Sequence, residues 1–208
     1  MFSNTRIQYN THIMKIYLAS KSPRRKELLT QMGVEFETLP LDIAEEVKDD
    51  ETPYEYSQRI TSDKLIAAWQ EITANNLLQH PVLCADTEVV IDNNVLGKAA
   101  NYQDAFAMLK QHSGRNHEVI TTVGLKYHNY MKIETTITIV EFTNIPDDAI
   151  HKYLKMGDYK DKSGSYGIQS YIGQFIRKIN GCFYSVMGLP LSTVRDLLAD
   201  LEKALKHD

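Results

Sequence analysis

The first segment that could do chemistry is Ser20–Arg25, which reads Ser-Lys-Ser-Pro-Arg-Arg and follows a short apolar run. Ser22 can cap a helix that begins at Pro23, because proline at the first helical position lacks only an N–H that would have no helical partner. The first turn then presents free backbone N–H groups and the positive end of the helix dipole beside Arg24 and Arg25. The segment predicts an anion site, with phosphate as the expected anion. The alternative is an ordinary capped helix with two solvated arginines.

Asp86 is the strongest single candidate for a catalytic group. It interrupts a β-like run, with the apolar segments 82–85 and 89–91 on either side, where a carboxylate has no packing role. A buried carboxylate without partners is costly, so Asp86 should bind a cation, accept hydrogen bonds or lie in a polar cleft. The alternative is a turn aspartate paired with Thr87.

Further charged residues could complete a site around this carboxylate. The cations are Lys64 on the apolar face of a predicted helix, Lys98 after a glycine at a strand end, and Lys162 in a glycine-flanked loop, while Glu45 and Glu46 lie in an acidic loop. Each alone could be a solvated surface group. Together, the cations suit a polyphosphate, and the carboxylates suit Mg²⁺, which takes one or two carboxylates and completes its shell with phosphate oxygens and water. The spacing alone leaves open whether they converge.

The elements that must position these residues alternate between strand-like and helix-like patterns, which favours a mixed α/β fold. We expect strands at 16–19, 34–39, 81–91, 95–98, 117–127 and 131–142, and helices at 23–33, 52–78, 102–113, 146–156 and 191–201. The pattern Thr52-Pro53-Tyr54-Glu55 predicts a capping box at the start of the second helix. A glycine-rich loop covers 161–169, and a β-hairpin is expected from 175–179 and 183–187 around Asn180-Gly181. The absence of repeats and linkers predicts one folding unit, 14–208. Residues 1–13 are predicted to be a polar N-terminal extension, either an upstream start or a loose, disordered arm, without the apolar core of a secretory signal.

Composition narrows the functional class without naming it. The 208 residues carry a formal net charge of −4, which argues against a broad nucleic-acid footprint. Cys84 and Cys182 are far apart and lack metal-like spacing, so both are expected to be free thiols in a cytoplasmic protein. No apolar run reaches the roughly 18 residues of a membrane span. The Walker A, dinucleotide-binding and Gly-x-Ser-x-Gly motifs are absent, and the histidines show no zinc spacing.

Four separated blocks combine specific polar residues in a fixed order. They are Leu18–Arg25; Ala85–Thr87 with Leu96–Lys98; Ser113–Val119; and Asp161–Gln169 with Val186–Leu191. In this combination the chain resembles the Maf (septum-formation-associated) nucleoside triphosphate pyrophosphatases, from about Met14 to the C-terminus. The resemblance implies a twisted mixed sheet flanked by helices with a central cleft, as in Maf and ITPase-like proteins. It also implies metal-dependent hydrolysis of a nucleoside triphosphate to the monophosphate and pyrophosphate, as housecleaning of nucleotide pools.

The resemblance also implies roles for individual residues. Asp86 matches the family's proposed catalytic carboxylate, which accepts a proton from the attacking water. Ser20, Arg24 and Arg25 match the phosphate-binding loop, Lys64 and Lys98 match conserved lysines, and Arg24, Thr87 and Gln169 match positions associated with substrate choice. Glu45 best matches an acidic residue that helps Asp86 to hold the metal, although the adjacent Glu46 leaves that register open.

The Tyr-Gly-Ile-Gln block at 166–169 is similar to the branch that acts on dTTP and UTP rather than on 7-methyl-GTP. A divalent metal cofactor (Mg²⁺, Mn²⁺ or Co²⁺) and a homodimer are implied by the resemblance alone. Two alternatives stay open: a pyrophosphatase for modified nucleotides, and a nucleotide-sensing regulator of cell division with little catalysis. Asp86 and the acidic loop favour the enzymes, because a mere binder needs no general base.

The sequence departs from the family pattern near the matched residues. Ala99 follows Lys98 where the family usually has proline, and serines stand at 163, 165 and 170 where alanine or glycine is common. These changes bear on the rigidity of the loops more than on the chemistry.

Overall fold

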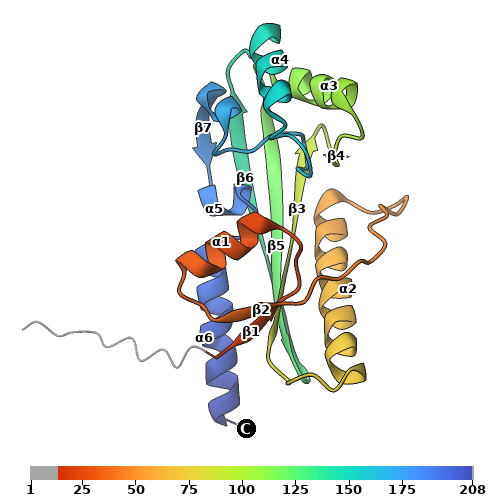
Figure 1. Cartoon of the computed structure of the whole chain (residues 1–208), viewed down its shortest axis with the longest axis vertical. Coiled ribbons are helices and arrows are strands. Elements are labelled where there is room, and N and C mark those ends of the chain that lie inside the picture. The colour runs from red at the N-terminus through yellow and green to blue at the C-terminus, as the bar shows by residue number, and fades with distance from the viewer. Residues whose placement is uncertain (1–13, 208) are drawn as a thin grey trace, which may run out of the picture.

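The computed structural model of the chain describes residues 14–207, so the predicted extension at 1–13 lies outside the described residues (Figure 1). Seven strands form one mixed sheet, which confirms the predicted mixed α/β fold. Their order is β2-β1-β3-β5-β6-β7, with β4 paired to β3. The strands are β1 (Ile16–Leu18), β2 (Phe36–Thr38), β3 (Val82–Ile91), β4 (Asn94–Leu96), β5 (Asn116–Tyr127), β6 (Tyr130–Phe142) and β7 (Ile176–Asn180). β1 runs parallel to β2 and β3, whereas the other pairings are antiparallel.

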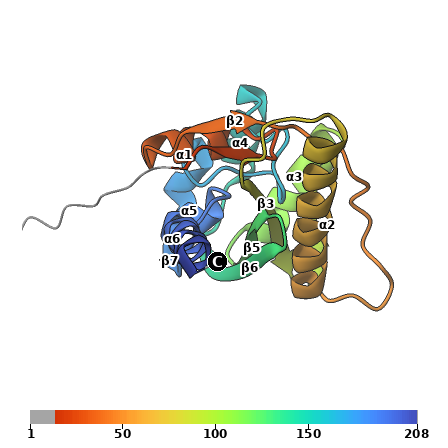
Figure 2. The same cartoon turned by 90° about the horizontal axis from the view of Figure 1, so that it is seen from below.

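The helices flank this sheet on two sides. They are α1 (Pro23–Gln31), α2 (Pro53–Ala74), α3 (Tyr102–His112), α4 (Asp147–Met156), α5 (Phe183–Val186) and α6 (Leu191–His207), with a 3₁₀ helix η1 at Tyr171–Phe175. Seen from below, α2 lies on one side of the long strands, and α1 with α6 lies on the other (Figure 2). α3 and α4 lie together at the far end of β5 and β6 (Figure 1). Within residues 14–207, no helix combines the length and apolarity that crossing a bilayer requires.

The helix starts that position the site have the predicted caps. The Ser22 side chain accepts a hydrogen bond from the backbone N–H of Arg25, and Pro23 is the first residue of α1. At α2, the Thr52 side chain and the Glu55 side chain bond each other's backbone N–H in a complete capping box. Both caps therefore fix the residue at which the loop becomes a helix. The other end of α2 differs from the prediction, because the helix ends at Ala74 and not near Leu78.

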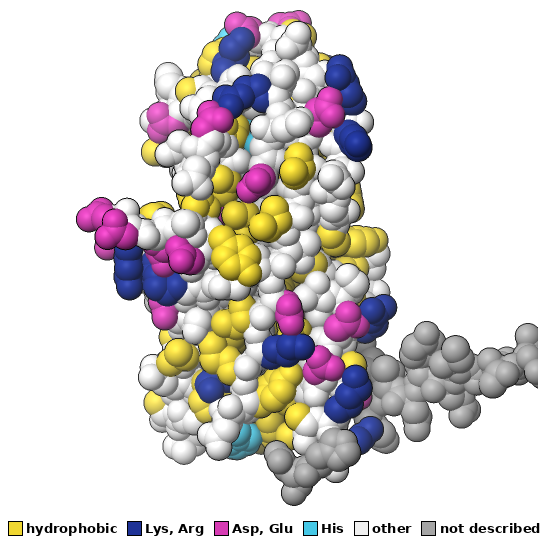
Figure 3. Space-filling model, turned by 180° about the vertical axis from the view of Figure 1, so that it is seen from behind, with side chains coloured by type: hydrophobic (Ala, Val, Ile, Leu, Met, Phe, Trp, Pro, Cys, Tyr) yellow, Lys and Arg dark blue, Asp and Glu magenta, His cyan; other side chains and the backbone are white. Residues whose placement is uncertain are grey.

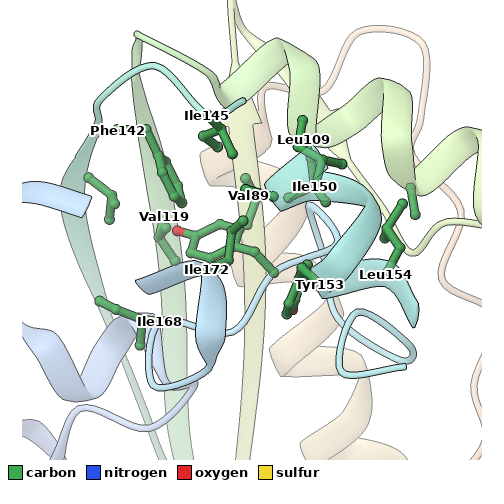
Figure 4. Close-up of a cluster of buried hydrophobic side chains, with 14 residues drawn as sticks. Val89, Leu109, Val119, Phe142, Ile145, Ile150, Tyr153, Leu154, Ile168 and Ile172 are labelled. Atoms are coloured by element: carbon green, nitrogen blue, oxygen red, sulfur yellow. The ribbon is translucent and has the colours of Figure 1, made fainter. Parts of the chain in front are cut away.

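Three apolar clusters hold the molecule together. The first joins α3, α4 and η1 to the upper ends of β3, β5 and β6, where Tyr153 and Phe142 are the largest fully buried side chains (Figure 4). The second packs α1 and α6 against β1, β3 and β5, and the third packs α2 against β1 and β3. The first cluster therefore forms one lobe and the other two form a second lobe, with β3, β5 and β6 running through both.

β6 is left partly uncovered at the back of the molecule, between α2 and α6. Its outward residues Ile137 and Ile139 keep 47% and 37% of their surface exposed. Apolar side chains are visible along the middle of this face (Figure 3). The covering helices therefore bury the two flanks of the sheet and not its whole back.

The predicted hairpin after 175 is wrong in its second half. β7 pairs with β6, but 183–186 form the short helix α5 instead of a returning strand. The Thr138 hydroxyl oxygen accepts the Cys182 N–H at 3.0 Å, and Ser185 Oγ donates to the Cys182 carbonyl at 2.7 Å. These side chains satisfy backbone groups that a strand ladder would otherwise pair, so the chain can turn at Gly181.

β3 is also not interrupted at Asp86, contrary to the sequence interpretation. It continues from Val82 to Ile91, and Asp86 pairs in register with Thr122 of β5. The strand tolerates a carboxylate in its middle because a cation from α2 meets it, as described below. Cys84 and Cys182 are free, as predicted.

Candidate active site

The sheet topology brings the predicted site residues to one cleft between the two lobes. β1 lies beside β3, with Leu18 in register with Leu83, so the loop after β1 meets the second half of β3. The cleft has a volume of about 570 Å³ and receives side chains from both lobes. Among the predicted residues, those that line it are Ser20, Arg24, Arg25, Glu45, Lys64, Asp86, Thr87, Lys98 and Lys162. Gln169 is exposed and lies outside this lining.

Arg25 is built into the wall of the cleft. Its Nε donates to the Gly188 carbonyl at 2.9 Å, Nη2 donates to Thr87 Oγ1 at 3.1 Å, and Nη1 donates to Ser20 Oγ at 3.4 Å. Thr87 Oγ1 also accepts from Thr121 at 3.2 Å, so the Thr87 hydroxyl is engaged by the wall. Burial lowers the pKa of Arg25, although Asp86 opposes that effect. Arg25 therefore offers a fixed, desolvated cation whose orientation three contacts determine.

Arg24 and Lys98 face the same cleft with their charged groups unengaged. Among residues 14–207, neither makes a side-chain hydrogen bond or an ion pair, although both line the cleft. Burial lowers the pKa of Arg24. These two unpaired cations and the N-terminus of α1, all on the lining of the cleft, supply the positive potential that a polyanion requires.

The cleft also contains a three-residue ion-pair network centred on Lys64. Its Nζ contacts Asp86 Oδ1 at 2.6 Å and Glu45 Oε1 at 2.7 Å. Burial acts to lower the pKa of Lys64, but Asp86 and then Glu45 outweigh it, so the pKa lies above its usual value. Burial likewise acts to raise the pKa of Asp86, and Lys64 outweighs it, so the carboxylate stays ionised. Lys64, which the sequence places on the apolar face of α2, is therefore the partner that makes a buried carboxylate tolerable.

Asp86 keeps one oxygen available. Its Oδ2 is buried and receives no hydrogen bond from an N–H or hydroxyl group, while the residue as a whole is only 6% exposed. The neighbouring Glu88 carboxyl, in its protonated form, hydrogen-bonds to the Asp86 carboxylate and helps to lower the pKa of Asp86. A buried ionised oxygen without an N–H or hydroxyl donor is a costly arrangement unless a ligand uses it. This oxygen is the best-placed proton or cation acceptor in the cleft.

Glu88 is a functional candidate that the sequence reading missed. It is two residues beyond Asp86 on the same face of β3, lines the cleft and is only 7% exposed. Burial and the neighbouring Asp86 raise its pKa well above the usual range of a carboxylic acid. The period-two spacing of a strand could have identified it, because Asp86 and Glu88 must share a face.

The glycine-rich loop 161–169 closes the cleft from the other lobe. Ser163 forms a bridge with Lys98 and donates its hydroxyl to the Thr87 carbonyl at 3.0 Å. Lys162 donates to the Asp158 carbonyl and, within residues 14–207, pairs with no carboxylate. Gly164 adopts a left-handed conformation, with φ of +65°. The loop is therefore bonded directly to residues of the candidate site.

We expect Gly164→Ala to destabilise the protein by more than its conformation alone would cost. A left-handed alanine costs about 1–2 kcal/mol, and a Cβ at Gly164 would lie only 2.7 Å from Val89 Cγ1. Gly157→Ala is the matched control, because its φ is +80° and no atom lies within 4 Å of the added Cβ. Urea unfolding should show a larger decrease in the free energy of unfolding for Gly164→Ala than for Gly157→Ala. Equal decreases would contradict the close packing of Gly164 against Val89.

Comparisons with known proteins identify the family to which the chain is similar. A family model described as "Maf-like protein" matches residues 15–201. A protein of Chromobacterium violaceum named dTTP/UTP pyrophosphatase is 39% identical over 191 residues, 92% of this chain and 96% of that protein. A protein of the same name from Aliivibrio fischeri is 42% identical over 184 residues, 88% of this chain and 96% of that one. The Staphylococcus aureus Ham1 structure aligns at a TM-score of 0.39 and 13% identity, covering 62% of this chain and 71% of that one, a likeness too low to support an argument.

Proposed function

The chain belongs to the Maf-like protein family, and on that premise we propose that it hydrolyses dTTP and UTP to the nucleoside monophosphate and pyrophosphate. The observation that carries the proposal is the ionised Asp86 carboxylate, whose Oδ2 is buried without an N–H or hydroxyl donor in a cleft that Arg24, Arg25 and Lys98 also line. The names of the relatives support the two substrates, since the chain spans nearly their whole length.

The cations that line the cleft suit the leaving group of this reaction. Attack on the α-phosphorus expels pyrophosphate, on which negative charge grows as the bond breaks. Arg24, Arg25 and Lys98, with the N-terminus of α1, would bind the β- and γ-phosphates and neutralise that charge. The Arg25 guanidinium need not reorient when phosphate binds, because its three contacts with Gly188, Thr87 and Ser20 already fix it.

Asp86 would act as the general base. Its free Oδ2 can accept a hydrogen bond from water and then the proton that the water loses on attacking phosphorus. Lys64 keeps the carboxylate ionised and occupies its other oxygen, so a single oxygen faces the substrate. Lys64 thus orients the base.

A divalent metal also fits these residues. Asp86 and Glu45 supply the hard oxygen donors that Mg²⁺ prefers, and Glu88 lies beside them. Among the described residues, no group of three His, Cys, Asp or Glu side chains forms a ready-made metal site, so phosphate oxygens would complete the shell. When bound, the metal would lower the pKa of the attacking water and shield the phosphates.

The position of water attack tests the proposal most directly. We expect dTTP and UTP, assayed with Mg²⁺, Mn²⁺ or Co²⁺, to give monophosphate and pyrophosphate. In H₂¹⁸O the label should enter the monophosphate, because the water oxygen bonds to the α-phosphorus. Label in the pyrophosphate would place the attack on the β-phosphorus, and inorganic phosphate with a nucleoside diphosphate would exclude the proposed reaction. Faster turnover of modified triphosphates than of dTTP and UTP in the same panel would favour the pyrophosphatase for modified nucleotides. Tight nucleotide binding without turnover would favour the nucleotide-sensing regulator.

We propose a homodimer and a cytoplasmic location as well. The first rests on the family resemblance, and sedimentation velocity tests it. The second rests on the two unpaired cysteines, which suit a reducing compartment.

A further inference from the structure

The loop that carries Glu45 has little to hold it in place. It connects β2 to α2, has no helix or strand, and is exposed over most of 42–50. It runs beside α2 to the N-terminal end of that helix (Figure 1). Yet Glu45 contacts Lys64 at 2.7 Å, although its own side chain remains 43% exposed. Something other than burial must fix the path of this loop.

Arg59, on α2, makes the contacts that fix it. Its Nε and Nη2 form a two-point ion pair with the Glu51 carboxylate at 2.6 and 2.7 Å. Nη2 also donates to the Glu46 carbonyl at 2.8 Å, one residue from Glu45. A single guanidinium thus bonds the two ends of the stretch 46–51, and its planar fork geometry allows both contacts at once.

A second contact from the same helix supports this arrangement. The Tyr56 hydroxyl donates to the Glu45 carbonyl at 3.3 Å, and the Arg59 guanidinium lies 5.6 Å from the centre of the Tyr56 ring. The arginine and the tyrosine therefore hold consecutive backbone carbonyls, those of Glu46 and Glu45. The Glu45 side chain leaves this fixed backbone toward Lys64.

We propose that Arg59 is a positioning residue for the reaction, which fixes the acidic loop so that Glu45 meets Lys64 beside Asp86. This inference rests on the proposed function, in which Glu45 serves the metal and phosphate side of the cleft. Arg59 itself does not line that cleft and acts only through Glu45.

The alternative is that Arg59 makes an ordinary surface ion pair. Exposed pairs contribute little, typically under about 1 kcal/mol. This one differs because it is two-pronged, because the Arg59 and Glu51 side chains are only 23% and 10% exposed, and because the same group holds a backbone carbonyl. The contact of Arg59 with Asp63, at 3.4 Å and with Asp63 49% exposed, is of the ordinary kind.

A double-mutant cycle between Arg59 and Glu45 tests the proposal. Arg59→Lys keeps the charge but cannot make the two-pronged contact and the carbonyl bond together. We expect it to lower kcat by about 10–100-fold, the usual effect of losing a group that orients a ligand residue, with little change in the KM for nucleotide. In the Glu45→Gln background the same substitution should lower kcat by less than about 2-fold, because there is no carboxylate left to position.

Independent effects of Arg59→Lys and Glu45→Gln, multiplying in the double variant, would overturn the proposal. Asp63→Asn is the matched control and should leave kcat unchanged, because it removes only the weak contact of Arg59. Glu51→Gln keeps the arginine and should reproduce part of the loss, so the test survives if Arg59→Lys does not fold. A wild-type chain that releases no pyrophosphate would instead refute the proposed function, which separates the two failures.

Discussion

Asp86→Asn should lower the rate of pyrophosphate release by about 10²–10⁴-fold or more, the usual cost of losing a general base. Asparagine has the size of aspartate but cannot take a proton from water. It also removes the charge that holds Lys64 Nζ at 2.6 Å. The base and the orientation of its neighbour are therefore lost together, and the fall should appear in kcat with dTTP or UTP.

The fold should survive this substitution. The β3 ladder to β5 uses backbone groups at this position, and Lys64 keeps its contact with Glu45. Circular dichroism and urea unfolding of the variant check that the chain is folded. Asp92→Asn is the matched control, because Asp92 pairs with Arg115 at an exposed turn outside the cleft lining. Near-wild-type turnover by Asp86→Asn would refute the catalytic role.

Sequence patterns within one helix correctly predicted the features of the site that depend only on neighbouring residues of that helix. The cap at Ser22 and the capping box at Thr52 depend on residues within one helical turn, and both form as expected. Lys64 stands on an apolar helix face, and the structure places it inward, 14% exposed at its side chain. In each case, the side chain's partner or direction follows from its position in its own helix.

Other features depend on contacts distant in sequence and were not predictable in this way. Asp86 stays within β3 because Lys64, 22 positions earlier, balances its charge. The segment 183–186 is helical because Thr138 of β6 bonds the backbone ahead of it. Arg59 reaches back to Glu46 and Glu51 across a loop without regular structure. A pattern within one element carries no information on such pairings.

Two buried histidines give the second large expected effect, on stability against acid. His112 is fully buried and donates Nε2–H to the Gly164 carbonyl at 3.0 Å, since a carbonyl can only accept. His117 is 3% exposed, and its Nε2 bonds the Tyr166 hydroxyl at 2.6 Å. The Nδ1 atoms of both rings are buried without a partner. Burial lowers the pKa of His112 to about 4 and that of His117 to about 2.

The direction of the pH effect follows from proton binding. In the unfolded chain both rings take up protons below pH of about 6.5, whereas in the folded chain they stay neutral until pH falls to their lowered pKa values. The unfolded state therefore binds more protons in this window, and stability is lost as pH falls. Each ring contributes about 2 kcal/mol of loss at pH 5, so the pair should lower the free energy of unfolding by about 4 kcal/mol relative to pH 7.5.

Urea unfolding at pH 7.5, 6 and 5 measures this loss, and substitution separates it from the titration of carboxylates. His112→Gln combined with His117→Gln removes both titrating rings. That variant should start from a lower stability at pH 7.5, because glutamine packs less well among Phe142 and Tyr166. Between pH 7.5 and pH 5, its free energy of unfolding should then fall by about 4 kcal/mol less than that of the wild type. His128→Gln, at an exposed turn, should behave like the wild type. Parallel curves for all three proteins would mean that the rings titrate normally when folded, which a second N–H on a buried Nδ1 without an acceptor does not permit.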